Sequence, residues 1–558
     1  MAKVFGLIII AVLIVASLAP AGLSQTISAA SCSANDVATA LGNVAADGTQ
    51  VVIPACPAGV GWGAQTAFTH GNASVDANGQ INYNQTYSVV IQGQGTTTGS
   101  DNLGNPTGYN DQTVIIYDNA QTPQASSVLH VSMAPGKTLR ITGITIRQGT
   151  AAQQSNGALA IGGKAQSKPC ATADGSCLRF DHNHFYNINN VNVVTSGWIY
   201  GVADHNYFDF SAADTNGIRV LMDLYNNDAG GLGDQSWTDA ENWGTKQFFF
   251  IENNTVNQSN TGTIATINDC VMGGREVIRY NTMKGGNVYV QTHPIGVPYR
   301  GCRATEIYMN NADETGTTLA PQPFHTSRSG ASLVWGNTLT GYGQVMNVFY
   351  DRDGVSHKSL SLIPSGYGYC GNNVGGQVGT SPWDQNSNSS GYACIDQPGR
   401  GKGDLLSGLF PNRVNTALGN VAAWPRQALA PIYVWGQTFN TPNGGGISYF
   451  GSETSAVMAE NRDYYLELPN YGEQSSTFDG TKGIGQGPFS SRASTCSSPT
   501  YPGPAFWATD QNTLYVCTSA NTWSAYYAPY TYPHPLISGS GGSGNNVAPP
   551  TALTATVQ

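Results

Sequence analysis

The chain has 558 residues and few charges: 24 Lys and Arg against 34 Asp and Glu give a net charge of −10, and charged residues make up only 10% of it. About 25% is usual for a globular protein. This balance excludes a general nucleic-acid binder and a coiled coil, and the 40% hydrophobic and 10% aromatic content excludes a disordered chain. The 68 Gly and 28 Tyr residues are typical of an extracellular β protein.

The first 21 residues have the organisation of a secretory signal peptide. Lys3 precedes an apolar run over residues 4–18, and Ala19 and Ala21 supply the small residues of a cleavage site. The alternative is a single membrane anchor, but the run is shorter than the roughly 20 residues that a span needs. We therefore predict that residues 1–21 are a signal peptide, that the protein is secreted or on the cell surface, and that no membrane span remains after signal removal.

Ten cysteines follow the predicted signal, an even number that would reach an oxidising compartment. Sequence alone permits many pairings, but a stacked repeat brings chain neighbours together, so we predict five sequential disulfides. No close-spaced pair of zinc-knuckle type is present, which disfavours metal binding by these residues. The predicted bridges are Cys32–Cys56, Cys170–Cys177, Cys270–Cys302, Cys370–Cys394 and Cys496–Cys517.

Residues 22–50 are predicted to form an N-terminal cap built on one short helix. Ser33 is a favourable N-cap residue, and Val37, Leu41 and Val44 follow at helical spacing. An amphipathic helix of this kind can cover the exposed edge of a solenoid. Alternating apolar residues then predict strands near residues 51–54, 88–93, 113–117 and 139–147.

A repeated Asn organises the middle of the chain. Six short alternating strands each end in Asn, which is followed by one more residue and an apolar side chain. A period of about 25 residues with a fixed Asn is typical of a solenoid. Asn tolerates left-handed backbone angles in sharp turns, and stacked side-chain amides can hydrogen-bond along the coil. The predicted ladder is Asn183, Asn206, Asn254, Asn281, Asn311 and Asn337, with Gln437 in a seventh copy.

Three upstream segments carry a resemblance to known proteins. The sequences DGTQVVIP at 47–54, VIQGQG at 90–95 and LRITGITI at 139–146 resemble the opening of right-handed parallel β-helix proteins of the pectate-lyase-like superfamily. The Asn-terminated strands resemble the asparagine ladder of that superfamily. The resemblance covers roughly residues 34–350 and 430–450. It implies a fold but no single activity, because the superfamily includes lyases, hydrolases, esterases, epimerases, tailspikes and adhesins.

We therefore predict an all-β protein: a single-stranded right-handed parallel β-helix (solenoid) with an N-terminal helical cap and a small aromatic-rich C-terminal β module. The coil spans residues 51–455, with long loops at 351–428 where the period breaks. The module at 456–537 contains nine aromatic residues between positions 501 and 532. Residues 538–558 are a flexible Gly/Ser/Pro tail, whose end resembles the first strand of a fibronectin type III domain.

The candidate site comes from a basic stretch in an acidic protein. Residues 269–306 contain five Lys or Arg residues and three acidic ones. Arg275, Arg303 and Arg328 are about one period apart, which predicts neighbouring rungs on one face. Their guanidinium groups could grip the carboxylates of a uronic-acid polymer. The alternative is a structural ion-pair ladder with the nearby acidic residues Asp269, Glu276 and Glu306.

Elimination across a uronate needs a base near C5 and a cation on the carboxylate, supplied either by Arg or by Ca²⁺. Calcium is therefore a possible cofactor, with no ligands assigned. Three histidines beside ladder positions, His182, His184 and His205, are predicted to be structural. We predict catalytic roles for Arg275, His293 and Arg303 and substrate-binding roles for Asp269, His325 and Arg328.

Three functions remain open at this stage. The first is a secreted carbohydrate-active enzyme, with a lyase favoured over a glycoside hydrolase because few carboxylates lie on the strands. The second is a non-catalytic glycan-binding or adhesive cell-surface protein, and the third is a structural part of an extracellular assembly. The expected partner is a polysaccharide or cell-surface glycan, and not nucleic acid.

Overall fold

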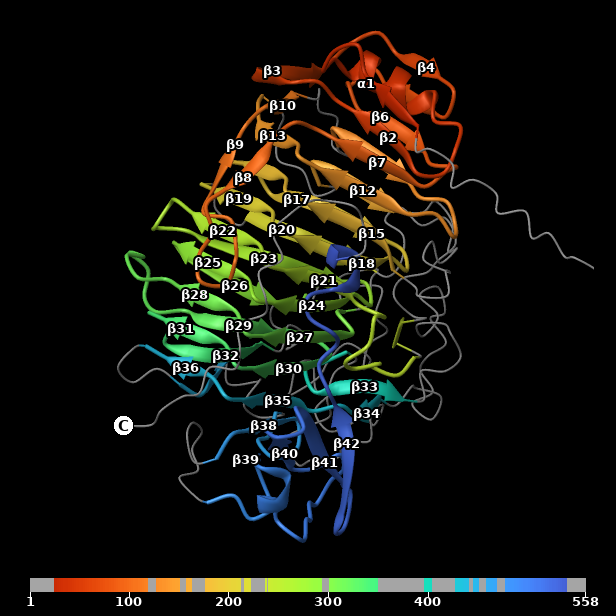
Figure 1. Ribbon diagram of the computed structural model, residues 1–558. Coiled ribbons are helices and arrows are strands. Elements are labelled where there is room, and N and C mark those ends of the chain that lie inside the picture. Colours follow the sequence, from red (N-terminus) through yellow and green to blue (C-terminus); the bar gives the residue numbers. More distant parts are fainter. Residues whose placement is uncertain are drawn as a thin grey trace, which may run out of the picture.

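The protein is a parallel β-helix, in which the chain coils so that successive strands stack into three long sheets (Figure 1). The predicted signal peptide, most of the 351–428 segment and nearly all of the tail lie outside the described residues. The computed structural model describes residues 25–118, 127–150, 157–162, 176–211, 215–221, 236–237, 239–293, 301–349, 396–403, 427–440, 445–450, 458–468 and 477–538.

Sheet 1 has twelve strands, and each pairs in parallel with its neighbours. In stacking order they are β1 (Thr26–Ser28), β2 (Thr49–Val52), β7 (Val89–Gln92), β12 (Leu139–Thr142), β15 (Ser176–Asp181), β18 (Tyr200–Asp204), β21 (Phe249–Glu252), β24 (Arg275–Arg279), β27 (Ala304–Tyr308), β30 (Ala331–Trp335), β35 (Ile432–Trp435) and β38 (Tyr464–Leu466).

Sheet 2 has ten strands, also all parallel. They are β3 (Cys56–Gly63), β10 (Thr113–Asp118), β13 (Thr145–Gln148), β16 (His184–Tyr186), β19 (Tyr207–Phe210), β22 (Thr255–Gln258), β25 (Thr282–Gly285), β28 (Asn311–Asp313), β31 (Thr338–Thr340) and β36 (Thr438–Phe439). A two-stranded hairpin, β8 (Thr96–Thr98) and β9 (Gly108–Asn110), belongs to the loop between β7 and β10.

Sheet 3 has twelve strands, parallel except at its first end, where β4, β5 and β6 pair antiparallel. They are β4 (Phe68–His70), β5 (Ala73–Val75), β6 (Ile81–Asn84), β11 (Leu129–Ser132), β14 (Leu159–Gly162), β17 (Val191–Ser196), β20 (Thr215–Leu221), β23 (Ile264–Val271), β26 (Asn287–Gln291), β29 (Pro323–Ser327), β32 (Gln344–Phe349) and β37 (Ile447–Phe450).

Each turn of the coil passes through sheet 1, then sheet 2, then sheet 3. The ten strands of sheet 2 correspond to ten turns, which confirms the predicted coil. Side chains alternate between the inside and the outside of the coil, because strand residues have a period of two. The inward side chains form one continuous apolar core, as in the sheet 1 column Ile141, Phe180, Ala203, Ile251, Ile278, Ile307, Val334 and Val434.

The asparagine ladder lies in the turn between sheets 1 and 2. The Nδ2 of Asn254 donates to Oδ1 of Asn281 at 3.0 Å and to the carbonyl of Ala203 at 2.9 Å, and its backbone N–H donates to the same Oδ1. This pattern repeats from rung to rung, so the predicted column is confirmed. The ladder consists of Asn183, Asn206, Asn254, Asn281, Asn310, Asn337 and Gln437.

Two details of the predicted ladder are wrong. Its fifth member is Asn310 and not Asn311, which instead begins β28 of sheet 2. The left-handed backbone angles belong to the residue before each ladder position, with φ between 50° and 65°, and not to the ladder Asn. Five of these residues are not glycine, so the ladder bonds must offset about 1–2 kcal/mol of strain at each. They are His182, His205, Asn253, Tyr280 and Met309, followed by Gly336 and Gly436.

The N-terminal end of the coil is covered by helix α1 (Ala34–Gly42), as predicted. Ser33 is its N-cap, and the Ser33 hydroxyl accepts from the backbone N–H of Asp36 at 3.2 Å. Val37 and Leu41 are buried in the same core as the coil interior. The helix therefore extends the core past the first strand edge and shields that edge from solvent.

Three of the five predicted disulfides are present as predicted. They are Cys32–Cys56, Cys270–Cys302 and Cys496–Cys517. Cys177 is also disulfide-bonded, but Cys170, Cys370 and Cys394 lie outside the described residues. The first bridge ties the cap to β3, and the second joins the end of β23 to the approach to β27.

The outer face of sheet 1 carries a second apolar core. Its outward side chains, among them Leu333, Tyr433 and Trp435, pack against a C-terminal module of four strands. The module consists of β39 (Ile484–Gly487), β40 (Ala505–Ala508), β41 (Thr513–Ser519) and β42 (Thr522–Tyr527), with a short 3-10 helix, η3 (Phe489–Ser491). Trp507, Tyr526 and Tyr527 of this module therefore cover sheet 1, whereas Phe489 and Tyr515 pack against each other within the module.

A C-terminal strap, residues 528–538, continues from β42 along the outside of sheet 1 to helix α4 (Pro535–Ser538) beside β18 (Figure 1). Arg279 donates to the carbonyls of Tyr530 and Thr531 at 2.8 and 2.9 Å. The backbone N–H of His534 donates to Glu252 at 2.9 Å, and Glu252 is ion-paired with Arg279. Charged side chains on sheet 1 thus hold the strap in place.

Replacing a central ladder residue should destabilise the whole coil. Asn254→Ala removes three hydrogen bonds that Nδ2 donates and two that Oδ1 accepts from Asn206, so buried polar groups on the neighbouring rungs lose partners. We therefore expect a loss of about 3 kcal/mol or more in the free energy of unfolding. Urea denaturation followed by circular dichroism measures it. Asn102→Ala, at an exposed position, is the matched control and should change little. If both variants were equally stable, the side-chain hydrogen bonds of the ladder would not contribute to the stability of the coil.

Buried Glu306 should make stability fall between acidic and neutral pH. Burial raises its pKa to about 7, against the weaker opposing effect of the hydrogen bond from the backbone N–H of Gly244. A carboxyl whose pKa is raised in the folded state contributes stability at low pH, and this contribution is lost as pH rises through about 7. Wild type should therefore lose about 3 kcal/mol between about pH 4.5 and 7 through this group.

The variant Glu306→Gln cannot ionise and tests this expectation. Thermal melts at several pH values should show a flatter pH dependence for Glu306→Gln than for wild type. Asp510→Asn, which changes an exposed carboxylate of the C-terminal module, serves as control. Parallel pH curves for wild type and Glu306→Gln would show that Glu306 does not titrate in this range.

Candidate functional site

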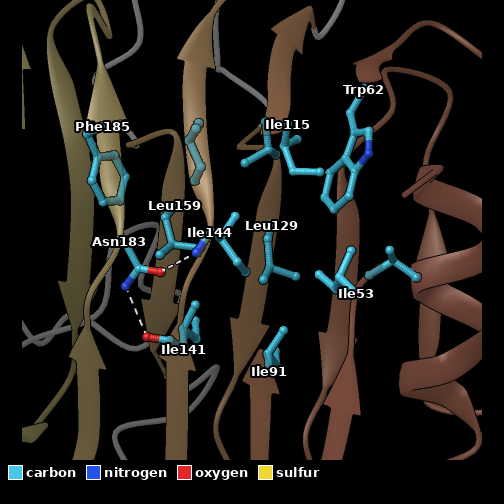
Figure 2. A pocket seen from close by; sticks show the side chains of 13 residues that line it. Ile53, Trp62, Ile91, Ile115, Leu129, Ile141, Ile144, Leu159, Asn183 and Phe185 are labelled. Atoms are coloured by element: carbon cyan, nitrogen blue, oxygen red, sulfur yellow. Dashed lines mark hydrogen bonds between the residues drawn. The ribbon is translucent and has the colours of Figure 1, made fainter. Parts of the chain in front are cut away.

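The cavity that the described residues enclose beneath α1 is too small to hold a ligand. A cavity of about 20 Å³ lies beneath α1, lined mostly by apolar side chains such as Ile53, Trp62 and Phe185 (Figure 2). Its polar residue, Asn183, is already used: its Nδ2 donates to the carbonyl of Ile141 and its Oδ1 accepts from the N–H of Ile144. A space of this size holds at most about one water molecule.

Arg275 and Arg303 do lie close together on the outside of sheet 1, but they are not in an open groove. Their side chains are 1% and 0% exposed, because residues 236, 237 and 239–241 pack against them. Arg275 donates to the carbonyls of Ala240 and Glu241 at 2.7 Å. Arg303 donates to the carbonyl of Asp239 and forms an ion pair with Glu241 at 2.9 Å.

The expectation that Arg275 and Arg303 line an open groove is therefore wrong. The two arginines hold the covering segment in position, with Trp237 packed against the Arg303 guanidinium at 5.1 Å. Contact with a polymer would require the segment to move away. The predicted ion-pair partners Glu276 and Glu306 are not used by these arginines either: Arg303 pairs with Glu241. The sequence identified the basic residues. It did not show that another segment covers them, because tertiary contacts decide where that segment packs.

The predicted substrate-binding role of His325 is also wrong, because this residue faces the interior of the coil. It pairs in register with Val290 and Met346, two residues of the coil interior, and its side chain is 0% exposed. Burial lowers the pKa of His325 to about 4, so the imidazole is neutral at physiological pH. Glu276 faces the same interior, where it accepts a hydrogen bond from Asn268 and burial raises its pKa well above the usual value.

The remaining predicted residues come together on the outer face of sheet 3. Asp269 lies near the end of β23, His293 follows β26 and Arg328 follows β29, so they occupy three successive rungs. Arg219 of β20 adds a fourth rung and pairs in register with Asp269. The Arg219–Asp269 ion pair is 2.6 Å long. We call Arg219, Asp269, His293 and Arg328 the sheet 3 cluster.

The backbone around the sheet 3 cluster is fixed from several sides. The N–H of His293 donates to the carbonyl of Cys270 at 2.8 Å, and the N–H of Cys302 donates to the carbonyl of His293 at 3.0 Å. The N–H of Arg328 donates to the hydroxyl of Thr292 at 2.8 Å. The Cys270–Cys302 disulfide therefore closes the loop that presents His293.

The cluster is positively charged overall. Burial alone would raise the pKa of Asp269, but the charge of Arg219, together with those of His293 and Arg328, holds that pKa below its usual value. Asp269 is only 2% exposed, whereas the other three side chains are partly exposed. One buried anion thus pairs with Arg219 and lies close enough to His293 and Arg328 to feel their charges, while the outer surfaces of these three side chains reach solvent. Such a set suits a carboxylate ligand.

Neutral polar side chains continue the same face. Gln291 donates to Asp269 at 3.4 Å and to Asn216 at 3.2 Å, and Tyr289, which is partly exposed, donates to Gln291 at 3.4 Å. An amide row with a tyrosine is well suited to sugar hydroxyls and a ring face. Sequence reasoning missed Arg219, Gln291 and Tyr289. Arg219 could have been found, because it lies two periods before Asp269 in an alternating strand.

One group of possible metal ligands lies together within the described ranges: Asp181, His182 and Asp204. Both carboxylates are already neutralised, Asp181 by Arg140 at 2.7 Å and Asp204 by Arg179 at 2.9 Å. The positive sheet 3 cluster is equally unfavourable for a cation. The possible use of calcium therefore stays a prediction, with no site assigned to it.

Comparison with protein-family models finds no matching family, and comparison with curated proteins finds no match. Among the helices that the structure describes, none is long and apolar enough to cross a membrane. The fold is a parallel β-helix, and the candidate functional residues are the exposed side chains on its outer faces.

Arg303→Ala should destabilise the protein rather than disturb a surface. Removing this buried guanidinium leaves Glu241 unpaired and frees the segment at 236–246, which should cost about 3 kcal/mol or more. Arg328→Ala, on a partly exposed residue, should cost less than about 1 kcal/mol. Urea midpoints of the two variants measure the difference. A normal midpoint for Arg303→Ala would restore the interpretation of this residue as a surface ligand.

Proposed function

We propose that the protein is secreted and binds an extracellular polysaccharide with carboxylate groups on the outer face of sheet 3, and that it acts there as a lyase. The observation that carries this proposal is the sheet 3 cluster, in which Arg219, His293 and Arg328 surround the buried Asp269 on successive rungs. The guanidinium of a single arginine can hold a carboxylate through two parallel hydrogen bonds.

The spacing of the cluster supports a polymer rather than a single small acid. Four rungs at about 4.8 Å per strand extend over roughly 14 Å, enough for more than one sugar unit. Tyr289, Gln291 and Asn216 lie on the same face and offer a ring surface and hydrogen-bonding groups. The disulfides and the predicted signal peptide support an extracellular location.

β-Elimination is the reaction that this set of groups could support. A base removes the proton at C5 of a 4-linked uronate, the C4–O bond breaks, and a C4=C5 double bond forms while the leaving oxygen takes up a proton. In the proposal, Arg219 and Arg328 neutralise the uronate carboxylate, which acidifies the C5 proton. His293 is the nearby group with a suitable basicity.

A non-catalytic glycan-binding protein is the second candidate. It is favoured by the chemistry of Asp269, whose carboxylate is held by Arg219 and so is not available as a general base or nucleophile. Both candidates use the same face and the same carboxylate ligand, and only product formation separates them.

Binding of acidic polysaccharides should depend on the sheet 3 arginines. Arg219→Ala and Arg328→Ala should each weaken binding of polygalacturonate or alginate about tenfold, and more at low salt, because each removes a charge-assisted contact. Arg147→Ala, on sheet 2, is the matched control and should bind like wild type. Affinity gel electrophoresis with each polymer measures the constants. Equal binding by all four proteins would refute this site.

The enzymatic part has a separate readout. Ultraviolet absorbance of the unsaturated product and a reducing-end assay, each with and without EDTA, distinguish elimination from hydrolysis and test the use of calcium. If the protein is a lyase, His293→Ala should abolish product formation while polymer binding remains within a fewfold of wild type. Binding without any product would leave the non-catalytic candidate.

A further inference from the structure

A second row of functional side chains lies on sheet 2, on a different face from the sheet 3 cluster. Successive strands place one outward residue of this row directly beside the next, and every member is exposed or partly exposed. Six strand spacings of about 4.8 Å give it a length of about 29 Å. The row consists of Arg147, Tyr186, Asp209, Asn257, Lys284, Asp313 and Thr340.

Tyr186 is unusual in this row. Its side chain is 41% exposed, and among the described residues only Tyr501 is another large hydrophobic residue with comparable exposure. Its ring contacts His184 edge-on at 5.7 Å between centroids, so it is supported from one side. A tyrosine that stays in solvent on a rigid strand offers a flat face at little entropic cost.

The outward column of sheet 2 next to this row is covered by another part of the chain, which forms a wall along one side of the row. The β8–β9 hairpin and the loop within it lie over it: Tyr109 donates to the carbonyl of His182 at 2.7 Å, Asn105 donates to the carbonyl of Tyr280 at 2.8 Å, and Thr255 donates to the carbonyl of Pro106 at 2.5 Å. The hairpin therefore runs beside the row without covering it.

His184 ties this wall to the row. Its Nδ1 lies 2.8 Å from Asp111 at the end of the hairpin segment, and its Nε2 lies 3.2 Å from Asp209 in the row. The two carboxylates raise the pKa of His184, although its burial acts in the opposite direction. Asn257 donates to the other oxygen of Asp209 at 2.8 Å, so the carboxylate is fixed on two sides.

We propose that this row is a second glycan-binding track, which binds an uncharged polysaccharide chain lying along the axis of the coil. Tyr186 stacks on a sugar ring, and the side chains of Asp209, Asn257 and Lys284 form hydrogen bonds with its hydroxyl groups.

The charges of the row select an uncharged ligand. Within the row, Arg147 and Lys284 carry two positive charges, and Asp209 and Asp313 carry two negative ones. An acidic polymer would meet a carboxylate on every third rung, and a basic polymer would meet a cation. Sugar hydroxyls both donate and accept, so they can pair with each member of the row in turn.

Native gels containing a soluble β-glucan, a galactomannan or dextran test the track through retardation of the protein. We expect wild type to be retarded by at least one of these polymers. Tyr186→Ala should bind that polymer about tenfold more weakly and Lys284→Ala several-fold more weakly, with unchanged melting temperatures because both side chains reach solvent. Tyr501→Ala is the matched control for an exposed tyrosine and should bind like wild type.

Testing each variant with both kinds of polymer distinguishes the sheet 2 row from the sheet 3 cluster. Arg328→Ala should keep its affinity for the neutral polymer, and Tyr186→Ala should keep its affinity for polygalacturonate. The track is refuted if none of the neutral polymers retards wild type, or if Tyr186→Ala and Lys284→Ala bind as tightly as wild type. It is also refuted if Arg328→Ala abolishes binding of the neutral polymer. Failure of acidic-polymer binding alone would overturn only the sheet 3 proposal.

Discussion

The turn between sheets 1 and 2 is the constraint on which the whole coil depends. It must bend the chain sharply within two residues, so one residue adopts left-handed angles and the next, usually Asn, lies inside the coil. An Asn amide buried there needs partners, and the next rung supplies them, as Asn281 does for Asn254. Because each amide bonds to the adjacent one, all rungs share one register, and every outward column is aligned along the coil.

Alignment of the outward columns explains how different faces came to have different roles. On sheet 1 the columns are apolar or carry paired charges, and the C-terminal module and strap bury them. Arg279 and Glu252 illustrate the consequence: they form an ion pair that is desolvated by the strap and also donate to or accept from its backbone. Charged residues that look like a binding site in the sequence thus become attachment points for another part of the same chain.

The sheet 3 cluster and the sheet 2 row differ in their electrostatics. The sheet 3 cluster places two arginines and a histidine around one buried carboxylate and carries net positive charge. The sheet 2 row alternates its charges and presents an exposed Tyr186. A β-helix allows this division because residues on different sheets belong to separate columns, so the chemistry of one face can change without disturbing the packing of another.

The sequence by itself determined the coil, the helical cap, three disulfides and the ladder apart from Asn310, because these follow from local periodicity and from contacts between chain neighbours. It also singled out Asp269, His293 and Arg328, but it placed Arg328 on one face with Arg275 and Arg303. Arg328 lies on sheet 3, whereas Arg275 and Arg303 lie on sheet 1. Only the tertiary structure decided that Arg275 and Arg303 are buried, that His325 faces inward and that Arg219 completes the cluster. Burial of an outward column depends on which distant segment covers it, and residues 236–246 and 528–538 carry no local signal of where they pack.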